Sequence, residues 1–225
     1  MNKVSAIILA AGNSSRFGEK KQFKKLNGKP IWVYSLNTFI QTQCIDQLIL
    51  VIPNDSLKPL QKSKVFTFLS EKNNIKLVSG GNSRKDSVLN GLGVVKEMND
   101  IVCIHDAARP FVKSSYIKDS IQFCSEFDGA ITAIPSVDTV KKAENQIIKK
   151  TINRDSVWMA QTPQTFNKKK LLHAIKKFSH LKITDESMLM EHAGFKIKII
   201  KGDYSNFKIT NKVDWELAKV VLRGQ

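Results

Sequence analysis

Short apolar runs alternate with segments of helical periodicity along the chain as far as Pro135. The apolar runs are rich in branched residues and end at polar or turn-forming residues, which is typical of strands buried on both faces. We expect such strands at Val4–Ala10, Gln47–Ile52, Ile75–Ser79, Ile101–His105 and Gly129–Ile134. The segments between them gather apolar residues on one side of a helix. We expect helices at Pro30–Gln41, Asp55–Ser70, Ser83–Met98 and Ser114–Glu126.

This alternation predicts an α/β fold, with a mostly parallel sheet that is covered by helices on both faces. In such sheets, ligands bind beyond the carboxyl ends of the strands. Three groups of small or polar residues stand at these ends: Ala10-Ala11-Gly12, Gly80-Gly81 and His105-Asp106. We therefore expect the functional site along this edge of the sheet.

The pattern changes after Pro135. Two short segments, Val137–Lys141 and Ile147–Thr151, flank a turn and predict a β-hairpin with too few apolar positions to be stable alone. We expect one domain over residues 1–225, from which an arm at about residues 135–154 projects toward a partner surface. The remaining predicted elements are helices at Asn167–Phe178, Thr184–His192 (capped by Thr184) and Lys212–Leu222, and a strand at Phe195–Lys201.

Composition narrows the class of protein. The N-terminus leads directly into the first predicted strand, no apolar run is long enough to span a membrane, and the three cysteines lack CxxC spacing. These features favour a cytoplasmic protein without a membrane partner. The net charge is +16, but it is spread evenly: residues 1–112 hold 16 basic and 8 acidic residues, and residues 113–225 hold 20 and 12. A basic nucleic-acid-binding protein is thus the alternative from a different class, and we do not expect specific nucleic-acid binding, because no aromatic-interleaved basic patch is present.

The loop after the first strand has features of a polyphosphate site. Asn13-Ser14-Ser15 is followed by Arg16, Gly18, Lys20 and Lys21. Backbone N–H groups and fixed positive charge both favour dense negative charge. The segment is neither a P-loop nor a GxGxxG turn. Taken alone, such a segment is more often an ordinary strand-to-helix turn with solvated lysines.

Each of the other polar segments also leaves two interpretations open. Asp106 could hold Mg²⁺, or it could cap a turn while paired with Arg109. Gly80–Ser83 could let the backbone approach a flat ligand, or form a tight turn in which Ser83 or Asn82 caps a helix.

The later basic residues are equally ambiguous on their own. Arg154 suits a phosphate monoester, but it could instead pair with Asp155 or Asp138. Lys208 lies between apolar residues, so it could point into the sheet-end cleft or remain one surface lysine among many.

Seven motifs change this picture because they occur in the order and spacing of one family. They are AAGNSSRFGEKKQF, GGNSRKDSVLNGL, HDAARPF, DTVKK, INRDSVWMAQTPQTF, TDES and GDYSNFKIT. On these motifs the chain resembles the 2-C-methyl-D-erythritol 4-phosphate cytidylyltransferases over nearly its whole length. The resemblance implies a Rossmann-like nucleotidyltransferase fold, CTP and a polyol phosphate as substrates, Mg²⁺ or another divalent cation, and a homodimer that exchanges the arm. The ribitol-5-phosphate cytidylyltransferases share most of the motifs and are the nearest alternative.

The resemblance also assigns roles residue by residue. The residues that it implies for the cytidine pocket and ribose are Ala10, Ala11, Gly12, Gly81, Asn82, Ser87 and Ala107. The residues that it implies for the acceptor are Arg109, Thr139, Arg154, Thr162 and Thr184. Asp106 would hold the metal, and Arg16, Lys21 and Lys208 would surround the α-phosphate.

The implied reaction is attack by a phosphate oxygen on the α-phosphorus of CTP, with loss of pyrophosphate. Such a reaction needs positioning and positive charge rather than a side-chain nucleophile. Arg16, Lys21, Arg154 and Lys208 are therefore the predicted catalytic residues. The loop between Arg16 and Lys21 is short and Lys20 stands where proline is common, so Lys20 could take the place of Lys21.

Overall fold

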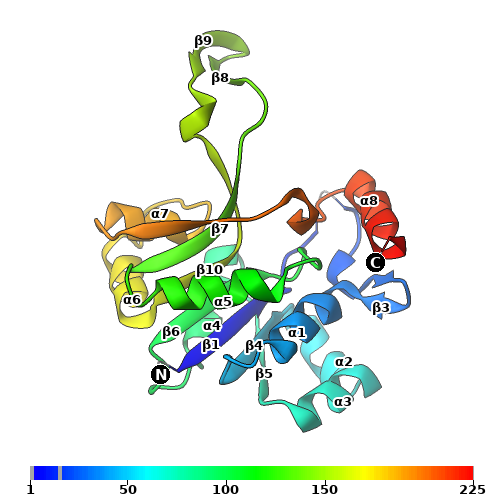
Figure 1. Ribbon diagram of the computed structural model, residues 1–225. Helices are drawn as coiled ribbons and strands as arrows, with labels where there is room; N and C mark the ends of the chain where they lie inside the picture. Colours follow the sequence, from blue (N-terminus) through cyan, green and yellow to red (C-terminus); the bar gives the residue numbers. More distant parts are fainter. Residues whose placement is uncertain (1–2, 15–16, 225) are drawn as a thin grey trace.

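The computed structural model describes residues 3–14 and 17–224. Its centre is a seven-stranded sheet in the order β11-β7-β10-β6-β1-β4-β5 (Figure 1). β10 runs antiparallel to β6 and β7, and the other neighbouring strands are parallel. The strands are β1 Val4–Leu9, β4 Gln47–Ile52, β5 Ile75–Ser79, β6 Ile101–Asp106, β7 Gly129–Pro135, β10 Trp158–Asn167 and β11 Ile197–Lys201. The predicted α/β fold with a mostly parallel sheet is confirmed.

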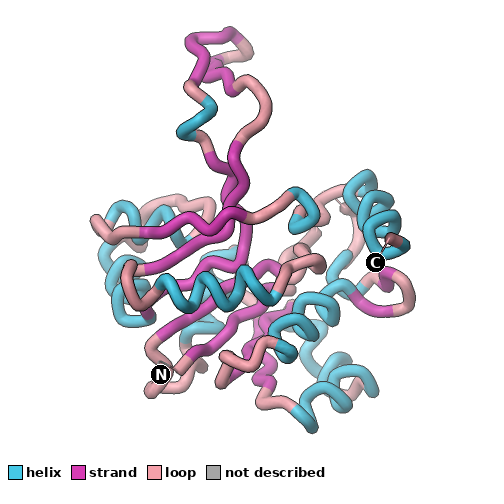
Figure 2. The backbone as a smooth tube through the Cα atoms, viewed as in Figure 1, coloured by secondary structure: helices cyan, strands magenta, loops and turns pink. Residues whose placement is uncertain are grey.

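Helices cover both faces of this sheet (Figures 1 and 2). They are α1 Ile31–Gln41, α2 Leu57–Gln61, α3 Lys64–Lys72, α4 Arg84–Leu92, α5 Ser114–Phe123, α6 Lys168–Lys177 and α7 Glu186–His192, and α8 Lys212–Arg223 packs beside the sheet. Because side chains alternate along β1, Ile8 packs into the core under α1, α2, α3 and α5, whereas Ile7 packs into the core under α4, α6 and α7. A third cluster joins Trp215 of α8 to Phe17 and to Leu26, which lies in the small hairpin of β2 (Lys25–Leu26) and β3 (Lys29–Pro30).

Two predicted helices depart furthest from their expected bounds. The segment Asp55–Ser70 is not one helix: a 3₁₀ turn, Asn54–Ser56, leads into α2, and α3 begins after Ser63. The Ser63 hydroxyl accepts a hydrogen bond from Phe66 N (3.3 Å), and this N-cap starts the second helix. The helix that begins after Ser83 ends at Leu92, well before Met98.

The strand β10 is absent from the sequence-based prediction. It lies between β6 and β7, where proline would normally exclude a strand. Its pairing with β7 shifts register between Ala160 and Gln164, so Pro163 falls in the irregular stretch. Gln161, Thr162 and Gln164 are buried with hydrogen-bond partners from other elements, and for this reason the strand lacks an apolar pattern.

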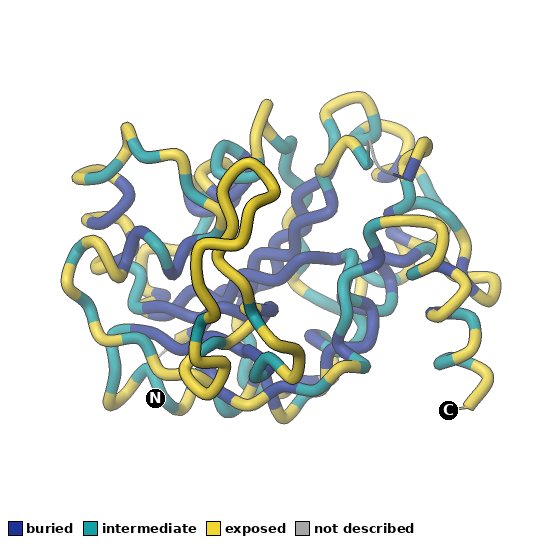
Figure 3. The backbone as a smooth tube through the Cα atoms, turned by 90° about the horizontal axis from the view of Figure 1, so that it is seen from above, coloured by how far each residue is buried: buried dark blue, intermediate teal, exposed yellow. Residues whose placement is uncertain are grey.

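The predicted hairpin is present as a projecting arm, residues 136–157 (Figures 1 and 3). Its strands, β8 Val140–Glu144 and β9 Ile147–Ile152, pair only with each other in the described part of the chain. Val137, Ile147 and Ile148 are each about 60% exposed. Apolar side chains left in solvent to this degree are typical of an interaction surface.

Every helix described in the ranges 3–14 and 17–224 is too short or too polar to cross a membrane. The cytoplasmic location expected from the sequence stays a prediction.

A glycine at the start of β7 gives a test of the sheet packing. A Cβ on Gly129 would lie 2.4 Å from Phe166 Cδ1 and 2.8 Å from the Thr165 carbonyl oxygen, both in β10. We expect Gly129→Ala to lower the free energy of unfolding by about 1–3 kcal/mol, because the neighbouring strand cannot move without disturbing the sheet.

The matched control is Gly93→Ala. A Cβ on Gly93 would make ordinary contacts at 3.5 Å, and its φ of −61° suits alanine. We expect a change below about 1 kcal/mol for this variant. Urea denaturation compares the two, and equal losses would contradict the packing argument.

Candidate active site

A cavity of about 290 Å³ opens at the carboxyl ends of β1 and β6, beside the start of α4. The loop after β1, the turn before α4, the end of β6 and Lys208 supply its walls. The lining residues are Leu9, Ala10, Ala11, Gly12, Asn13, Ser14, Lys21, Gln22, Gly81, Asn82, Ser83, Arg84, Ser87, Asp106, Ala107, Ala108 and Lys208. This is the sheet edge where the sequence predicted the site.

The loop after β1 is shaped by Gln22, whose side chain is almost completely buried. Its Nε2 donates to the carbonyl oxygen of Gly12 (3.1 Å), and its Oε1 accepts from the Ser14 hydroxyl (3.0 Å). One amide therefore holds two residues, Gly12 and Ser14, of the loop that forms a wall of the cavity. Sequence reasoning missed Gln22, because nothing in its local context distinguishes it from a surface glutamine.

The opposite wall is the N-terminus of α4. Ser83 and Asp86 form a capping box, since each side chain accepts a hydrogen bond from the other's backbone N–H (3.1 and 3.0 Å). The Ser87 hydroxyl accepts from Gly81 N (3.1 Å) and turns the preceding loop back onto the helix. A Cβ on Gly81 would lie 2.3 Å from the Asp86 Cβ, so this close approach requires glycine. The predicted cap by Ser83 is confirmed.

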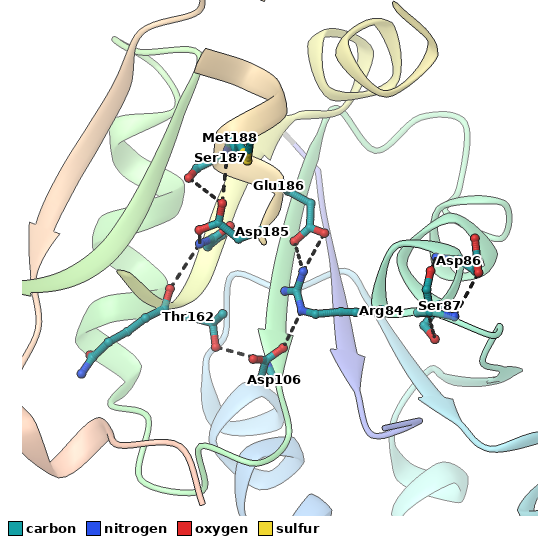
Figure 4. A network of polar contacts seen from close by, with 12 residues as sticks. Arg84, Asp86, Ser87, Asp106, Thr162, Asp185, Glu186, Ser187 and Met188 are labelled. Atoms are coloured by element: carbon teal, nitrogen blue, oxygen red, sulfur yellow. Dashed lines mark hydrogen bonds and ion pairs between the residues drawn. The ribbon is translucent and has the colours of Figure 1, made fainter. Parts of the chain in front are cut away.

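A chain of four charged groups crosses the back of the cavity (Figure 4 shows three of them). Asp106 Oδ1 accepts from Arg84 Nε (3.1 Å), and Asp106 Oδ2 accepts from Lys208 Nζ (2.7 Å). Arg84 Nη1 also donates to both carboxylate oxygens of Glu186 (2.7 Å each). The two positive and two negative charges balance. We call this set, Glu186, Arg84, Asp106 and Lys208, the charge chain.

Burial and pairing compete in the charge chain. Burial alone would raise the pKa of Asp106, but the positive charges of Arg84 and Lys208 outweigh it and hold that pKa well below its usual range. Burial would lower the pKa of Arg84, whereas the two carboxylates raise it. Burial raises the pKa of Glu186, and its pairing with Arg84 opposes this only in part. The cation of Arg84 is thus strongly stabilised between two acids.

Arg84 and Glu186 were not predicted as site residues, although they lie in the motifs GGNSRKDSVLNGL and TDES. Each stands at a helix start, where a charged residue usually faces solvent. The alternative in which Asp106 pairs with Arg109 is wrong: the cations that contact the Asp106 carboxylate are Arg84 and Lys208. Arg109 directs its guanidinium to the carbonyl oxygens of Asn206 (2.8 Å) and Ala160 (3.4 Å).

His105 lies behind this wall and is completely buried. Its Nδ1 lies 3.0 Å from the Thr162 hydroxyl and its Nε2 lies 3.1 Å from the carbonyl oxygen of Arg109. The Thr162 hydroxyl also accepts from Asp106 N (3.1 Å). His105 therefore supports the backbone of Asp106 and Arg109, as expected for a structural residue rather than a base.

Asp106 is also the predicted metal ligand. Residues 3–14 and 17–224 contain no group of three or more His, Cys, Asp or Glu side chains arranged to hold a metal ion. Mg²⁺, however, is commonly bound by one or two carboxylates together with substrate phosphates and water. A single carboxylate at the wall of an open cavity fits a cation of this kind.

The cavity brings together most of the residues that the sequence assigned to the nucleotide, the metal and the α-phosphate. They are Ala10, Ala11, Gly12, Lys21, Gly81, Asn82, Ser87, Asp106, Ala107 and Lys208. Lys20 does not line the cavity, and its Nζ instead lies 2.5 Å from Asp55 Oδ2. Of the two candidates, Lys21 thus occupies the place near the cavity. Arg16 lies outside the described residues.

The residues assigned to the acceptor do not line this cavity. Thr162 is buried behind Asp106, and Thr184 is exposed just before α7. Thr184 does not cap α7: Asp185 is the N-cap, and its carboxylate accepts from Met188 N (3.2 Å). Thr139 and Arg154 are exposed on the arm, where Arg154 Nη1 donates to the carbonyl oxygen of Val137 (2.6 Å).

Comparison with known proteins decides the family. Residues 4–224 match the sequence profile of the family IspD: 2-C-methyl-D-erythritol 4-phosphate cytidylyltransferase. The chain belongs to this family. It is accordingly an enzyme of the nucleotidyltransferase class, and the Rossmann-like fold expected from the sequence is that of solved family members.

The chain matches single-function enzymes and also a bifunctional enzyme. It is 38% identical over 227 residues to the 2-C-methyl-D-erythritol 4-phosphate cytidylyltransferase of Clostridium botulinum (strain Loch Maree / Type A3), covering 99% of this chain and 98% of that enzyme. It is also 38% identical to the bifunctional enzyme IspD/IspF of Desulfotalea psychrophila, of which it spans 58%. The structure of 4-diphosphocytidyl-2C-methyl-D-erythritol synthase from Anaerococcus prevotii DSM 20548 superposes with a TM-score of 0.86 at 32% identity, covering 99% of both chains.

His105 gives a prediction about stability. Its burial lowers its pKa from 6.5 to about 4, so between these values the unfolded chain binds a proton that the folded chain does not. The free energy of unfolding should therefore fall as the pH is lowered from 6.5 to 4, and His105 should account for up to roughly 3 kcal/mol of this fall.

Urea denaturation at several pH values in this window measures the effect. His105→Gln is the control, because an amide can replace hydrogen bonds but does not titrate. We expect the variant to lose less stability than the wild type over the same window. An identical pH dependence in both proteins would assign the effect to other groups.

Proposed function

We propose that this protein transfers CMP from CTP to 2-C-methyl-D-erythritol 4-phosphate, releasing pyrophosphate, in the non-mevalonate route to isoprenoids. The family match over residues 4–224 carries this proposal. The cavity supports it, because its lining combines glycine and alanine backbone with the cationic side chains of Lys21 and Lys208. These are the surfaces that a nucleotide base and its phosphates need.

The nucleotide would lie between the loop after β1 and the start of α4. The small residues Ala10, Ala11, Gly12 and Gly81 let the base approach the backbone closely, while Asn82, Ser87 and Ala107 offer polar and ribose contacts. The phosphates then meet Lys21 and Lys208. The α-phosphate role of Arg16, next to this loop in the sequence, remains part of the proposal.

In the reaction, a phosphate oxygen of the acceptor forms a bond to the α-phosphorus, and the bond from that phosphorus to the bridging oxygen breaks. The electron pair leaves with pyrophosphate. Negative charge grows on the α-phosphoryl oxygens and the leaving group, so Lys21 and Lys208 stabilise the transition state more than the ground state. Asp106 is the residue that would hold Mg²⁺, which would supply further positive charge to the phosphates.

The acceptor would be held by Arg109, Thr139, Arg154, Thr162 and Thr184. Arg154 and Thr139 lie on the arm, which projects from the body of its own chain (Figure 1). The exposed apolar residues of the arm would also be buried if a partner subunit packed against them. We therefore include a two-fold dimer in the proposal, in which each arm completes the acceptor site of the partner.

A pyrophosphate-release assay tests the substrate. With CTP and Mg²⁺, we expect turnover with 2-C-methyl-D-erythritol 4-phosphate and little with ribitol 5-phosphate. The control is Lys208→Ala, which should lower kcat by roughly 10²-fold if the ammonium acts on developing charge. Preference for ribitol 5-phosphate would change the assigned acceptor, and silence with both acceptors would contradict the proposed function.

Subunit complementation tests the shared site. Lys21→Ala and Arg154→Ala should each be nearly inactive alone. If Arg154 acts in the partner's site, a mixed dimer has one site with both lesions and one site with neither. Random exchange makes about half of the dimers mixed, so about a quarter of wild-type activity should return.

The matched control combines Lys21→Ala with Lys208→Ala. Both residues line the same cavity of one chain, so every site in a mixed dimer keeps one lesion and activity should not return. If the Arg154 pair also stays silent after verified exchange, the shared site is wrong.

A further inference from the structure

The Asp106 carboxylate contacts two cations of its own chain, one on each oxygen. Arg84 Nε lies 3.1 Å from Oδ1, and Lys208 Nζ lies 2.7 Å from Oδ2. All three residues line the cavity. A divalent cation that binds Asp106 therefore meets two positive charges already in place, and at such short distances in a partly buried site their repulsion is strong.

The two cations are anchored differently. Arg84 is held from two sides, since its Nη1 also donates to both oxygens of Glu186, a side chain that is only 1% exposed (Figure 4). Lys208 has a single ion pair within the described ranges, the one with Asp106, and its side chain is 35% exposed. Its flexible four-carbon stem also permits movement that the planar, doubly anchored guanidinium does not.

Because Arg84 has two acidic partners and Lys208 has one, the free energy needed to move each cation away from Asp106 also differs. If Arg84 moved away, Glu186 would keep a buried negative charge without its partner, which is strongly unfavourable. If Lys208 moved away, its ammonium could turn into the cavity that it already lines. No buried charge would then be left alone, because Arg84 would remain between the two carboxylates.

We propose that Glu186 is a positioning residue, which fixes Arg84 on Asp106 so that Lys208 is the cation released when a divalent cation binds there. The inference rests on the proposed function, in which Asp106 holds the metal and Lys208 acts on the α-phosphate. Lys208 thereby becomes available to phosphate oxygens in those sites that are loaded for reaction. Glu186 acts through Arg84 and touches no substrate.

Acetylation of lysines by the N-hydroxysuccinimide ester of acetate, read by peptide mass spectrometry, measures the release. An ammonium must leave its carboxylate partner before its nitrogen can react. Lys76, an exposed lysine of β5 that does not line the cavity, serves as the internal reference. In the wild type without CTP, we expect millimolar Mg²⁺ to raise the labelling of Lys208 relative to Lys76 by about threefold or more. The comparison sample holds the same ionic strength of tetramethylammonium chloride.

Three variants separate positioning from a general structural role. In Glu186→Gln, Arg84 loses its second anchor and can leave in place of Lys208, so the Mg²⁺-induced rise should shrink. Glu186→Asp keeps the charge and should restore part of the rise. Asp106→Asn should show high labelling of Lys208 with or without Mg²⁺. If circular dichroism shows that Glu186→Gln is unfolded, Arg84→Lys replaces it, because one ammonium lacks the two separate nitrogens with which Arg84 contacts Asp106 (Nε) and Glu186 (Nη1).

Two results would overturn the inference: unchanged labelling of Lys208 on adding Mg²⁺ to the wild type, or an undiminished rise in the folded Glu186→Gln or Arg84→Lys variant. Pyrophosphate release is measured on the same wild-type preparation. If the enzyme is active but shows no labelling response, the release of Lys208 is contradicted and the proposed function is not. A labelling response in a protein that does not turn over CTP contradicts the proposed function instead.

Discussion

The partly buried ion pair between Arg84 and Glu186 is the interaction on which the candidate site depends. It joins two helix starts that are about one hundred residues apart in the chain, and Asp106 and Lys208 extend it to the end of β6 and to the segment before α8. A buried charge must keep its partner, so each of these segments fixes the position of the others. The cavity wall is therefore held by electrostatics between four segments that are distant from one another in the sequence.

Apolar packing places these elements where their charges can meet. α4, α6 and α7 share one core with the odd-numbered residues of β1, and this core sets the two helix starts side by side at the edge of the sheet. Helix caps then orient the polar residues: Ser83 with Asp86 at α4, and Asp185 at α7. The site thus combines a non-directional hydrophobic framework with directional contacts at its rim.

The strands β1, β4 and β6 were predictable because both of their faces are buried, which makes each one a continuous apolar run. The position of the cavity followed from where parallel strands end. β10 and the Arg84–Glu186 pair were not predictable from local pattern, because their polar residues are satisfied by partners far away in the sequence. The seven motifs supplied the remaining site residues through family resemblance, but they did not reveal which carboxylate faces which cation.

The arm is continuous with two strands of the sheet. β7 and β10 pair from Gly129 and Phe166 in the body to Pro135 and Trp158 at the base of the arm, with a shift of register between Ala160 and Gln164. β10 also carries Thr162, whose hydroxyl holds the backbone N–H of Asp106. The arm and the back wall of the cavity therefore share one strand, so the backbone that carries the arm also supplies the hydroxyl that holds Asp106 N.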